Sequence, residues 1–327
     1  MHSFSYNRVG EVAEAVTDLN EHSNAKFIAG GTNLLDLMKE NVEHPEHLTD
    51  INRLSLSTIE QTEDGVRLGA LATNADTAYL ELIESQYPLL SKAILAGASP
   101  QLRNMATNGG NLFQRTRCYY FYDTATACNK REPGSGCSAI NGINRIHAIL
   151  GTSEQCIATH PSDMCVALAA LDAKVNVTGS DGDRTIAFED FHRLPGDTPH
   201  LDNNIRNGEL VTSIDLPTNN FTKNVFYLKL RDRQSYAFAL VSVAAALELD
   251  GNIIKDIRLA LGGVAHKPWR SKEAEAQMVG KEATHENFLT MAEHILADAK
   301  GFGHNDFKIE LAKRAIVRAF SEALKAE

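Results

Sequence analysis

The chain has 327 residues, 43% of them hydrophobic, and a formal net charge of −10 at pH 7. Because nucleic-acid binding depends on Lys and Arg neutralising phosphates, this acidic balance argues against nucleic acid as the main partner. No apolar run approaches the roughly 18 residues of a membrane-spanning helix, so we expect no membrane span. The length predicts about two domains.

The N-terminus and the cysteine count bear on compartment and chemistry. Residues 1–8 contain no apolar core of a Sec-type signal, so we expect no such signal on this chain. The chain has five cysteines, a count that is not even. They favour reduced thiols, metal ligands or catalytic thiols over a disulfide framework.

The first distinctive motif is a glycine turn after a short apolar run. Helical spacing over 13–19 is followed by an expected strand at 26–28, the pair Gly30-Gly31, and a helix starting near Asn33. Glycines let backbone N–H groups approach a ligand closely, and a helix N-terminus favours anionic oxygens. The turn therefore suits a pyrophosphate, although an ordinary strand-to-helix turn has the same pattern. It is not the GxGxxG motif of a Rossmann site.

Short elements follow, and most of them are bounded by polar turns. Asn74 is the expected N-cap of a helix. Pro161-Ser162-Asp163 precedes an apolar helix in which we expect Cys165 to be a small buried hydrophobe. The expected elements are a hairpin of 58–60 with 66–68, helices over 75–84, 89–96 and 164–171, a second hairpin of 174–177 with 185–188, and a strand over 209–216.

A boundary between domains is expected at Pro217-Thr218-Asn219-Asn220. Strands followed by helices then predict a C-terminal domain of the α+β class. The expected strands are 225–230, 238–249 and 253–264, and the expected helices are 272–279, 286–299 and 307–325.

A long segment without regular pattern lies between Thr107-Asn108-Gly109-Gly110-Asn111 and His160-Pro161-Ser162-Asp163. Loops of this length inside a compact domain are uncommon and usually functional. The segment contains four cysteines in the spacing C-x9-C-x8-C-x18-C. Structural zinc sites have closer pairs, and ferredoxins have different spacings. This spacing is compatible both with a metal or iron–sulfur site and with free thiols. The cysteines are Cys118, Cys128, Cys137 and Cys156.

The same segment is rich in basic residues, although the chain is acidic. Cations would offset the negative charge of an iron cluster held by four thiolates, and charge and hydrogen bonding set its potential. The basic residues are Arg115, Arg117, Lys130, Arg131 and Arg145.

Two motifs together resemble a known family. They are Ala29-Gly30-Gly31-Thr32-Asn33-Leu34 and the stretch 101–111, Gln-Leu-Arg-Asn-x-Ala-Thr-x-Gly-Gly-Asn. The resemblance is to the FAD-binding medium subunit of molybdenum hydroxylases, which include xanthine dehydrogenase, carbon monoxide dehydrogenase and 4-hydroxybenzoyl-CoA reductase. Ordinary members lack the cysteine segment. It resembles the insertion of 4-hydroxybenzoyl-CoA reductase and, more closely, that of bacterial periplasmic aldehyde oxidoreductases, whose flavin subunit carries a [4Fe-4S] cluster. The resemblance covers essentially the whole chain.

The resemblance implies a fold and a division into domains. Residues 1–220 would form a two-part FAD-binding domain of the vanillyl-alcohol-oxidase (PCMH) type, with a [4Fe-4S] loop insertion at about 112–158. Residues 221–327 would form a small α+β domain of the CO-dehydrogenase flavoprotein type, with a three-stranded antiparallel sheet and helices.

The resemblance also implies roles for individual residues. Lys229 matches a lysine near the flavin pyrimidine edge, where a cation would stabilise the reduced anionic flavin; an exposed strand lysine is the alternative. Phe238 matches an apolar residue against the isoalloxazine, with a simple core role as the alternative, and Tyr236 is a further candidate for ring contact. The implied cluster ligands are the four segment cysteines. The implied FAD-binding residues are Ile28, Ala29, Gly30, Gly31, Thr32, Asn33, Leu34, Ala98, Thr107, Gly110, Asn111, Ser162, Asp163, Lys229 and Phe238.

The implied function is electron transfer within a heterotrimer. A separate molybdenum subunit would oxidise an aldehyde to a carboxylic acid, and a [2Fe-2S] subunit would pass the electrons to FAD on this chain. FAD would deliver them to an external acceptor. The resemblance further implies a periplasmic location by co-export with a partner's twin-arginine signal; a cytoplasmic location is the alternative.

Other functions remain open from the sequence. The chain could serve an enzyme similar to 4-hydroxybenzoyl-CoA reductase or xanthine dehydrogenase. It could also be a non-redox zinc-binding assembly protein, or an FAD protein with four idle thiols.

Overall fold

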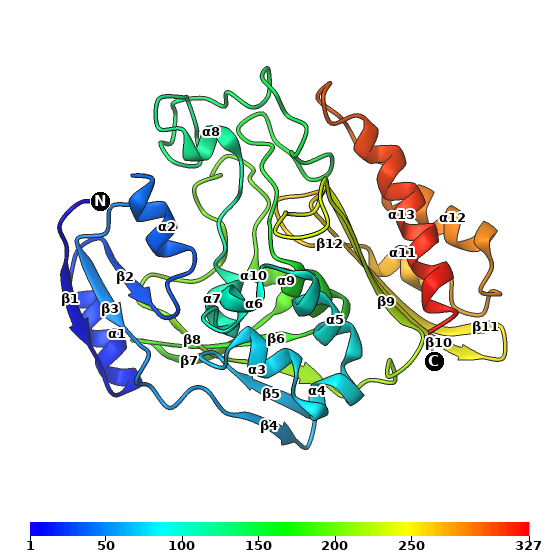
Figure 1. Ribbon diagram of the computed structural model, residues 1–327, viewed down its shortest axis with the longest axis horizontal. Helices are drawn as coiled ribbons and strands as arrows, with labels where there is room; N and C mark the ends of the chain where they lie inside the picture. The colour runs from blue at the N-terminus through cyan, green and yellow to red at the C-terminus, as the bar shows by residue number, and fades with distance from the viewer. Residues whose placement is uncertain (327) are drawn as a thin grey trace.

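A three-stranded parallel sheet forms near the N-terminus of the computed structural model, which describes residues 1–326 (Figure 1). The strand order is β1-β3-β2, and the central strand β3 is buried along its whole length. The sequence predicted α1, β2 and α2 but missed β1 and β3, because their residues, SYNR and HLTD, are largely polar. The elements are β1 (Ser5–Arg8), α1 (Val12–Glu21), β2 (Ala25–Ile28), α2 (Leu34–Lys39) and β3 (His47–Asp50).

A five-stranded antiparallel sheet forms the base of the N-terminal part. Its order is β4-β5-β8-β6-β7, so β8 pairs with one strand of each predicted hairpin and joins the two hairpins into one sheet. The strands are β4 (Ile59–Thr62), β5 (Gly65–Gly69), β6 (Lys174–Gly179), β7 (Gly182–Ala187) and β8 (Leu210–Pro217).

Short helices lie over this sheet (Figure 1). The prediction that Asn74 caps a helix over 75–84 is wrong, because the Thr73 hydroxyl accepts the Asp76 N–H and is the cap. The backbone is extended at Leu80, which divides the expected helix into α3 and α4. These helices are α3 (Asn74–Ala78), α4 (Glu81–Gln86), α5 (Pro88–Ala96), α6 (Pro100–Arg103), α7 (Asn108–Leu112), α9 (Asp163–Ala170) and α10 (Phe188–Phe191), whereas α8 (Tyr119–Tyr122) lies apart from the sheet (Figure 1).

The C-terminal part is an antiparallel sheet of order β12-β11-β10-β9, covered on one face by helices (Figure 1). The prediction of three strands is wrong by one, because the two-residue strand β12 was too short to leave a pattern. The strand expected to begin at Phe238 begins at Val241 instead. The elements are β9 (Val225–Leu230), β10 (Val241–Asp250), β11 (Ile253–Gly262), β12 (Trp269–Arg270), α11 (Lys272–Ala276), α12 (His285–Ile295) and α13 (Phe307–Ala323).

Helix α9 joins the two parts of the chain. All eight of its residues are buried, Cys165 among them, as the sequence predicted for that cysteine. The helix shares one apolar core with β5, β6 and β8 on one side and with Ala244, Ala246 and Ala260 of β10 and β11 on the other. This packing places Ser162 and Asp163, at the start of α9, where the two parts meet.

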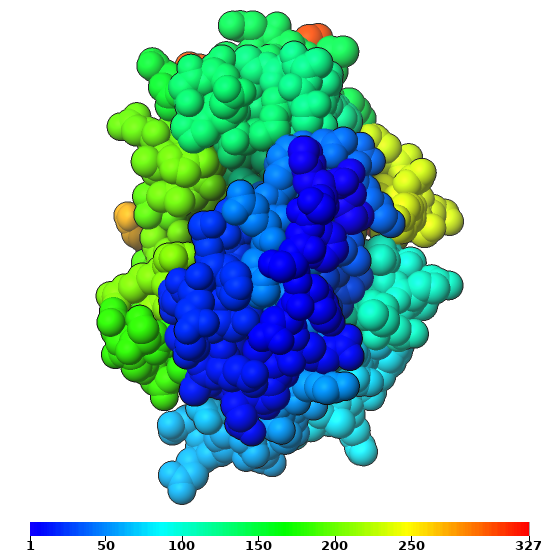
Figure 2. Space-filling view, turned by 90° about the vertical axis from the view of Figure 1, so that its left-hand side faces the viewer, coloured from blue at the N-terminus to red at the C-terminus, as the bar shows by residue number. Residues whose placement is uncertain are grey.

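The cysteine segment has little secondary structure. Between α7 and α9 the described chain contains the four-residue helix α8 and an isolated bridge between Cys128 and Cys137. The segment lies above the parallel sheet and α2, and it forms one end of the molecule (Figures 1 and 2). No helix in residues 1–326 is long and apolar enough to cross a bilayer.

Candidate functional site

The glycine turn between β2 and α2 packs directly on the backbone before α7. A Cβ atom at Gly30 would lie 1.8 Å from the Met105 carbonyl oxygen, so a larger residue does not fit without backbone movement. Gly31 has φ of +69°, in the left-handed region that favours glycine. Residues 28–34 are all half-buried, and Leu34 starts α2. The close packing joins both glycine motifs at one place.

Asn33 connects this turn to the start of the cysteine segment. Its Oδ1 accepts the Arg115 N–H at 2.9 Å, while its Nδ2 is buried and has no hydrogen-bond partner among the described residues. A buried donor without an acceptor costs about 1–3 kcal/mol. An anionic cofactor oxygen would satisfy it. The donor therefore fits a phosphate-containing ligand such as FAD.

The second and third motifs contact each other across the cysteine segment. Thr107 caps α7 by accepting the Gly110 N–H, and Ser162 caps α9 by accepting the Cys165 N–H. The Ser162 hydroxyl also donates to Asn111 Oδ1 at 2.5 Å. The two turns that bound the cysteine segment are therefore neighbours in the structure.

Lys229 lies inside the protein, so the alternative of an exposed strand lysine is wrong. Its Nζ donates to Asp163 Oδ2 at 2.7 Å and to the Ala96 carbonyl at 3.1 Å, and its side chain is 5% exposed. Tyr227 donates to the other Asp163 oxygen at 2.7 Å, and burial raises the pKa of Tyr227 well above its ordinary value. Strand β9 is thus tied to the start of α9 and to the Ala96 carbonyl. Ala98, two residues after Ala96, has φ of +50°.

Phe238 and Tyr236 lie in the exposed loop between β9 and β10. Phe238 is 48% exposed, so the core alternative is wrong for this residue too. The Arg117 guanidinium carbon lies 4.8 Å from the Phe238 ring centre, which places the ring next to the cysteine segment. Tyr236 is 61% exposed and has φ of +52°. Contact of either ring with a flavin stays a prediction.

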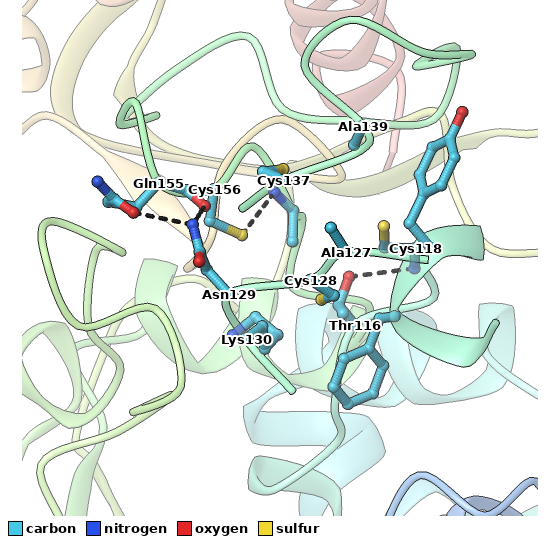
Figure 3. Close-up of a pocket in the computed structure, with 13 residues that line it drawn as sticks. Thr116, Cys118, Ala127, Cys128, Asn129, Lys130, Cys137, Ala139, Gln155 and Cys156 are labelled. Atoms are coloured by element: carbon cyan, nitrogen blue, oxygen red, sulfur yellow. Dashed lines mark hydrogen bonds between the residues drawn. The ribbon is translucent and has the colours of Figure 1, made fainter. Parts of the chain in front are cut away.

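The four cysteines of the segment surround one space (Figure 3). Cys118 precedes α8, Cys128 and Cys137 face each other in the isolated bridge, and the Cys156 sulfur accepts the Ala158 N–H at 3.4 Å. Cys165 is not among the residues that line this space. The structure therefore brings together four thiols, although up to 18 residues separate consecutive cysteines in the sequence.

The spacing of the sulfur atoms bears on the kind of metal group that the four cysteines could hold. Four thiolates on zinc, each at about 2.3 Å, would lie roughly 3.8 Å from one another. Within the described residues, the four cysteines do not form a group of three or more ligand atoms within 4.8 Å of one another. As they stand in the structure, no three of these sulfur atoms are as close together as the ligands of one zinc ion would be.

The pocket is also suited to thiols that lose their protons only on metal binding. Burial raises the pKa of Cys118 to about 12 and that of Cys156 to about 11. Without a metal both thiols are therefore neutral at pH 7. A metal or cluster would displace these protons, which makes binding dependent on pH.

The basic residues of the segment differ in their roles. Lys130 lines the cysteine pocket, with its Nζ donating to the Pro199 carbonyl at 2.7 Å and its ammonium 2.5 Å from Asp202. Arg131 instead donates to backbone carbonyls, including those of Tyr120 and Phe121, both at 2.8 Å. Of the five basic residues, Lys130 is the one that lines the cysteine pocket, while Arg131 holds the backbone of the loop.

His147 is a pocket neighbour that the sequence did not reveal. Its Nε2 lies 3.0 Å from the Cys118 sulfur, and burial, followed by the charge of Lys308, lowers the pKa of His147 to about 4. The two residues are 29 positions apart, and no motif connects them. Only the path of the folded chain brings them together.

Comparisons with known proteins agree with this arrangement. The family described as "FAD binding domain in molybdopterin dehydrogenase" matches residues 2–219, and "CO dehydrogenase flavoprotein C-terminal domain" matches residues 226–323. The chain is 51% identical to the aldehyde oxidoreductase FAD-binding subunit PaoB of Escherichia coli K12, over 99% of each chain. It is 30% identical to the glyceraldehyde dehydrogenase medium chain of Sulfolobus acidocaldarius, over 98% of each.

A solved structure shows the same fold. A chain of carbon monoxide dehydrogenase from Hydrogenophaga pseudoflava superimposes with a TM-score of 0.78 at 26% identity, covering 99% of this chain and 98% of that one. Both family matches lie on the parts of the chain that carry the glycine turns, the capped helices and the C-terminal sheet. The chain therefore belongs to the FAD-binding medium subunits of the molybdenum hydroxylases.

Proposed function

We propose that this chain is the flavin subunit of a molybdenum-dependent aldehyde oxidoreductase. The observation that carries the proposal is the 51% identity, from end to end, to a subunit named for aldehyde oxidation. The 30% identity to a glyceraldehyde dehydrogenase medium chain adds a second relative named for an aldehyde substrate. The chain would serve electron transfer and would not oxidise aldehyde alone.

The proposed reaction divides between subunits. Oxidation of an aldehyde with water, RCHO + H2O → RCOO− + 3 H+ + 2 e−, would take place on a molybdenum subunit. A [2Fe-2S] subunit would carry the two electrons toward this chain, and an external acceptor would remove them. Bound FAD supplies the ability to accept two electrons together and release them singly or in pairs.

This chain's own residues would hold and orient the flavin. The Gly30-Gly31 turn offers backbone N–H groups at close range, and Asn33 Nδ2 offers a buried donor without a partner in the described chain. Lys229 would place a positive charge near the flavin, fixed by its ion pair with Asp163. Phe238 would offer an exposed aromatic face.

We further propose that Cys118, Cys128, Cys137 and Cys156 bind a [4Fe-4S] cluster. Four convergent, buried or half-buried thiols and a sulfur spacing too open for zinc support this assignment. Lys130 beside the pocket would offset part of the cluster's negative charge. The cluster would supply one-electron storage or relay next to the flavin.

The proposed assembly is a heterotrimer with the molybdenum and [2Fe-2S] subunits. A periplasmic location, reached by co-export with a partner that carries a twin-arginine signal, accompanies the proposal; a cytoplasmic enzyme is the alternative. Folding around bound cofactors before export would protect the four thiols from oxidation. Detection of the complex in an osmotic-shock fraction that lacks a cytoplasmic marker enzyme would test the location.

The function is tested on the complex purified with its partners under anaerobic conditions. We expect flavin absorption bands with a broad iron–sulfur shoulder, and reduction of an artificial acceptor that depends on added aldehyde. Turnover of 4-hydroxybenzoyl-CoA or hypoxanthine in place of aldehydes would overturn the substrate assignment. A colourless chain with bound zinc would overturn the redox role, and flavin without iron or sulfide would remove the cluster alone.

A further inference from the structure

A histidine lies against one of the four cysteine sulfurs. The His147 Nε2 atom is 3.0 Å from Cys118 Sγ, and the His147 side chain is buried. The rings of Tyr119 and Tyr120 lie 6.5 Å and 6.3 Å from the imidazole. Cys118 is buried as well, so the contact lies away from water, where a hydrogen bond is stronger than in water.

The surroundings decide which ring nitrogen carries the proton. His147 Nδ1 is buried and has no hydrogen-bond partner among the described residues. A proton on Nδ1 would leave a buried N–H without an acceptor, and a thiolate bound to a cluster has no proton to donate to the Nε2 lone pair. With a metal-bound thiolate at Cys118, the hydrogen bond therefore forms only with the proton on Nε2, whose N–H then points at the sulfur. The imidazole is therefore the donor and the sulfur the acceptor.

The C-terminal part of the chain fixes the position of His147. Its carbonyl oxygen accepts from Lys308 Nζ at 2.8 Å and from Asn305 Nδ2 at 3.3 Å, and both donor residues are fully buried. Its N–H donates to the Asn144 carbonyl at 3.0 Å. With its backbone held on both sides, the imidazole is kept next to the sulfur.

We propose that His147 is a positioning residue whose hydrogen bond to the Cys118 sulfur raises the reduction potential of the cluster. The inference rests on the proposed [4Fe-4S] site. Reduction adds one electron, and the extra negative charge is shared with the thiolate sulfurs. A donor at a sulfur stabilises the more negative, reduced state more than the oxidised state. Removing the donor therefore lowers the potential.

Two substitutions at His147 separate hydrogen bonding from packing. His147→Phe keeps a planar ring and removes the donor, whereas the amide nitrogen of His147→Gln reaches close to the position of Nε2. The variants are compared in the purified complex by a redox titration followed by low-temperature EPR. We expect four irons per site in each, a lower cluster midpoint potential in His147→Phe, and recovery of most of the shift in His147→Gln. The flavin midpoint serves as the internal control.

A second measurement does not depend on the stability of a variant. Pulsed EPR of the reduced complex, labelled with 15N-histidine, should detect a nitrogen coupled to the cluster of this chain. Absence of that coupling, or an unchanged midpoint potential in His147→Phe, would overturn the role of His147 and leave the cluster in place. Absence of any iron–sulfur signal from this chain would overturn the proposed cluster itself.

Discussion

The five-stranded sheet and the cysteine segment are stabilised in different ways. In the sheet, β8 pairs with β5 and β6, and the strands cover an apolar core shared with α5 and α9. The cysteine segment has a four-residue helix, one isolated bridge and a small apolar cluster. Its buried members are Leu37, Val42, Cys118, Phe121, Cys128, Ala139 and Ile157.

In the cysteine segment, hydrogen bonds from side chains take the place of the backbone–backbone hydrogen bonds of a regular element. Asn144 donates to the carbonyls of Ala139, Gly142 and Phe302 at 3.3, 3.2 and 2.8 Å. Buried backbone groups need partners wherever no regular element supplies them. The sheet is therefore held by hydrogen bonds between backbone strands and by the burial of apolar side chains. The segment depends on single polar contacts and, in our account, on a bound cluster.

The largest effect is expected from Cys128→Ser, which removes a thiolate ligand. We expect iron and acid-labile sulfide of this chain to fall from four of each to near zero. Amide hydrogen exchange should rise across 113–161 while the five-stranded sheet stays protected, because local openings differ between cooperative units. Cys165→Ala, at a cysteine outside the pocket, is the matched control and should keep its iron. Unchanged iron in Cys128→Ser would remove this residue from the ligand set.

A large effect on the flavin alone is expected from Gly30→Ala. The added Cβ would lie 1.8 Å from the Met105 carbonyl, so the turn must move away from the second glycine motif. Purified protein should lose most of its FAD, measured by flavin fluorescence after denaturation, and should keep its iron. Gly10→Ala is the control, since no atom lies within 4 Å of its added Cβ. Normal flavin content in Gly30→Ala would contradict the placement of FAD at this turn.

A moderate effect is expected from Lys229→Met, which leaves the Asp163 carboxylate buried without its ammonium partner. Breaking a buried ion pair in this way destabilises by about 3 kcal/mol. We expect a lower thermal unfolding midpoint and weaker FAD retention in the same variant. Lys223→Met, at an exposed lysine, should change neither. A drop in stability with unchanged FAD affinity would assign Lys229 a purely structural role.

The smallest effect concerns the dependence of the cysteine segment on pH. Burial opposes ionisation of Asp202, but its ion pairs with Lys130 and Arg115 hold the pKa of this carboxyl well below its usual range. Its contribution to stability is present above the ordinary Asp pKa of about 3.9 and is lost as pH falls toward the folded value. Acidification below about pH 4 should loosen the segment in hydrogen exchange, and Asp202→Asn should weaken that dependence. An identical pH profile in Asp202→Asn would contradict the assignment.

The sequence predicted the regular parts of the fold well, because their periodicity is local. The hairpins β4–β5 and β6–β7 and helices α5, α9 and α13 were found within a few residues of their bounds. Strands β1 and β3 were missed because parallel pairing joins polar segments about 40 residues apart, as in the register of Ser5 with His47. Short elements such as β12 leave too few residues for a pattern.

At the candidate site, the sequence indicated which residue types are present. The fold shows which of these side chains contact one another. Four thiols in one segment were visible in the sequence, but their convergence and the contact of His147 with Cys118 depend on the folded path. Likewise, Lys229 was selected by resemblance, whereas its ion pair with Asp163 required the packing of β9 against α9. Side chains that meet across domains leave no periodic signal in the sequence.

The most direct test of the account is anomalous diffraction at the iron absorption edge from crystals of the anaerobically purified complex. We predict a strong iron peak between Cys118, Cys128, Cys137 and Cys156, with FAD density along the Gly30–Asn33 turn and no iron at Cys165. An empty cysteine pocket, or a peak that appears only at the zinc edge, would contradict the proposal that this chain holds an iron–sulfur cluster beside its flavin.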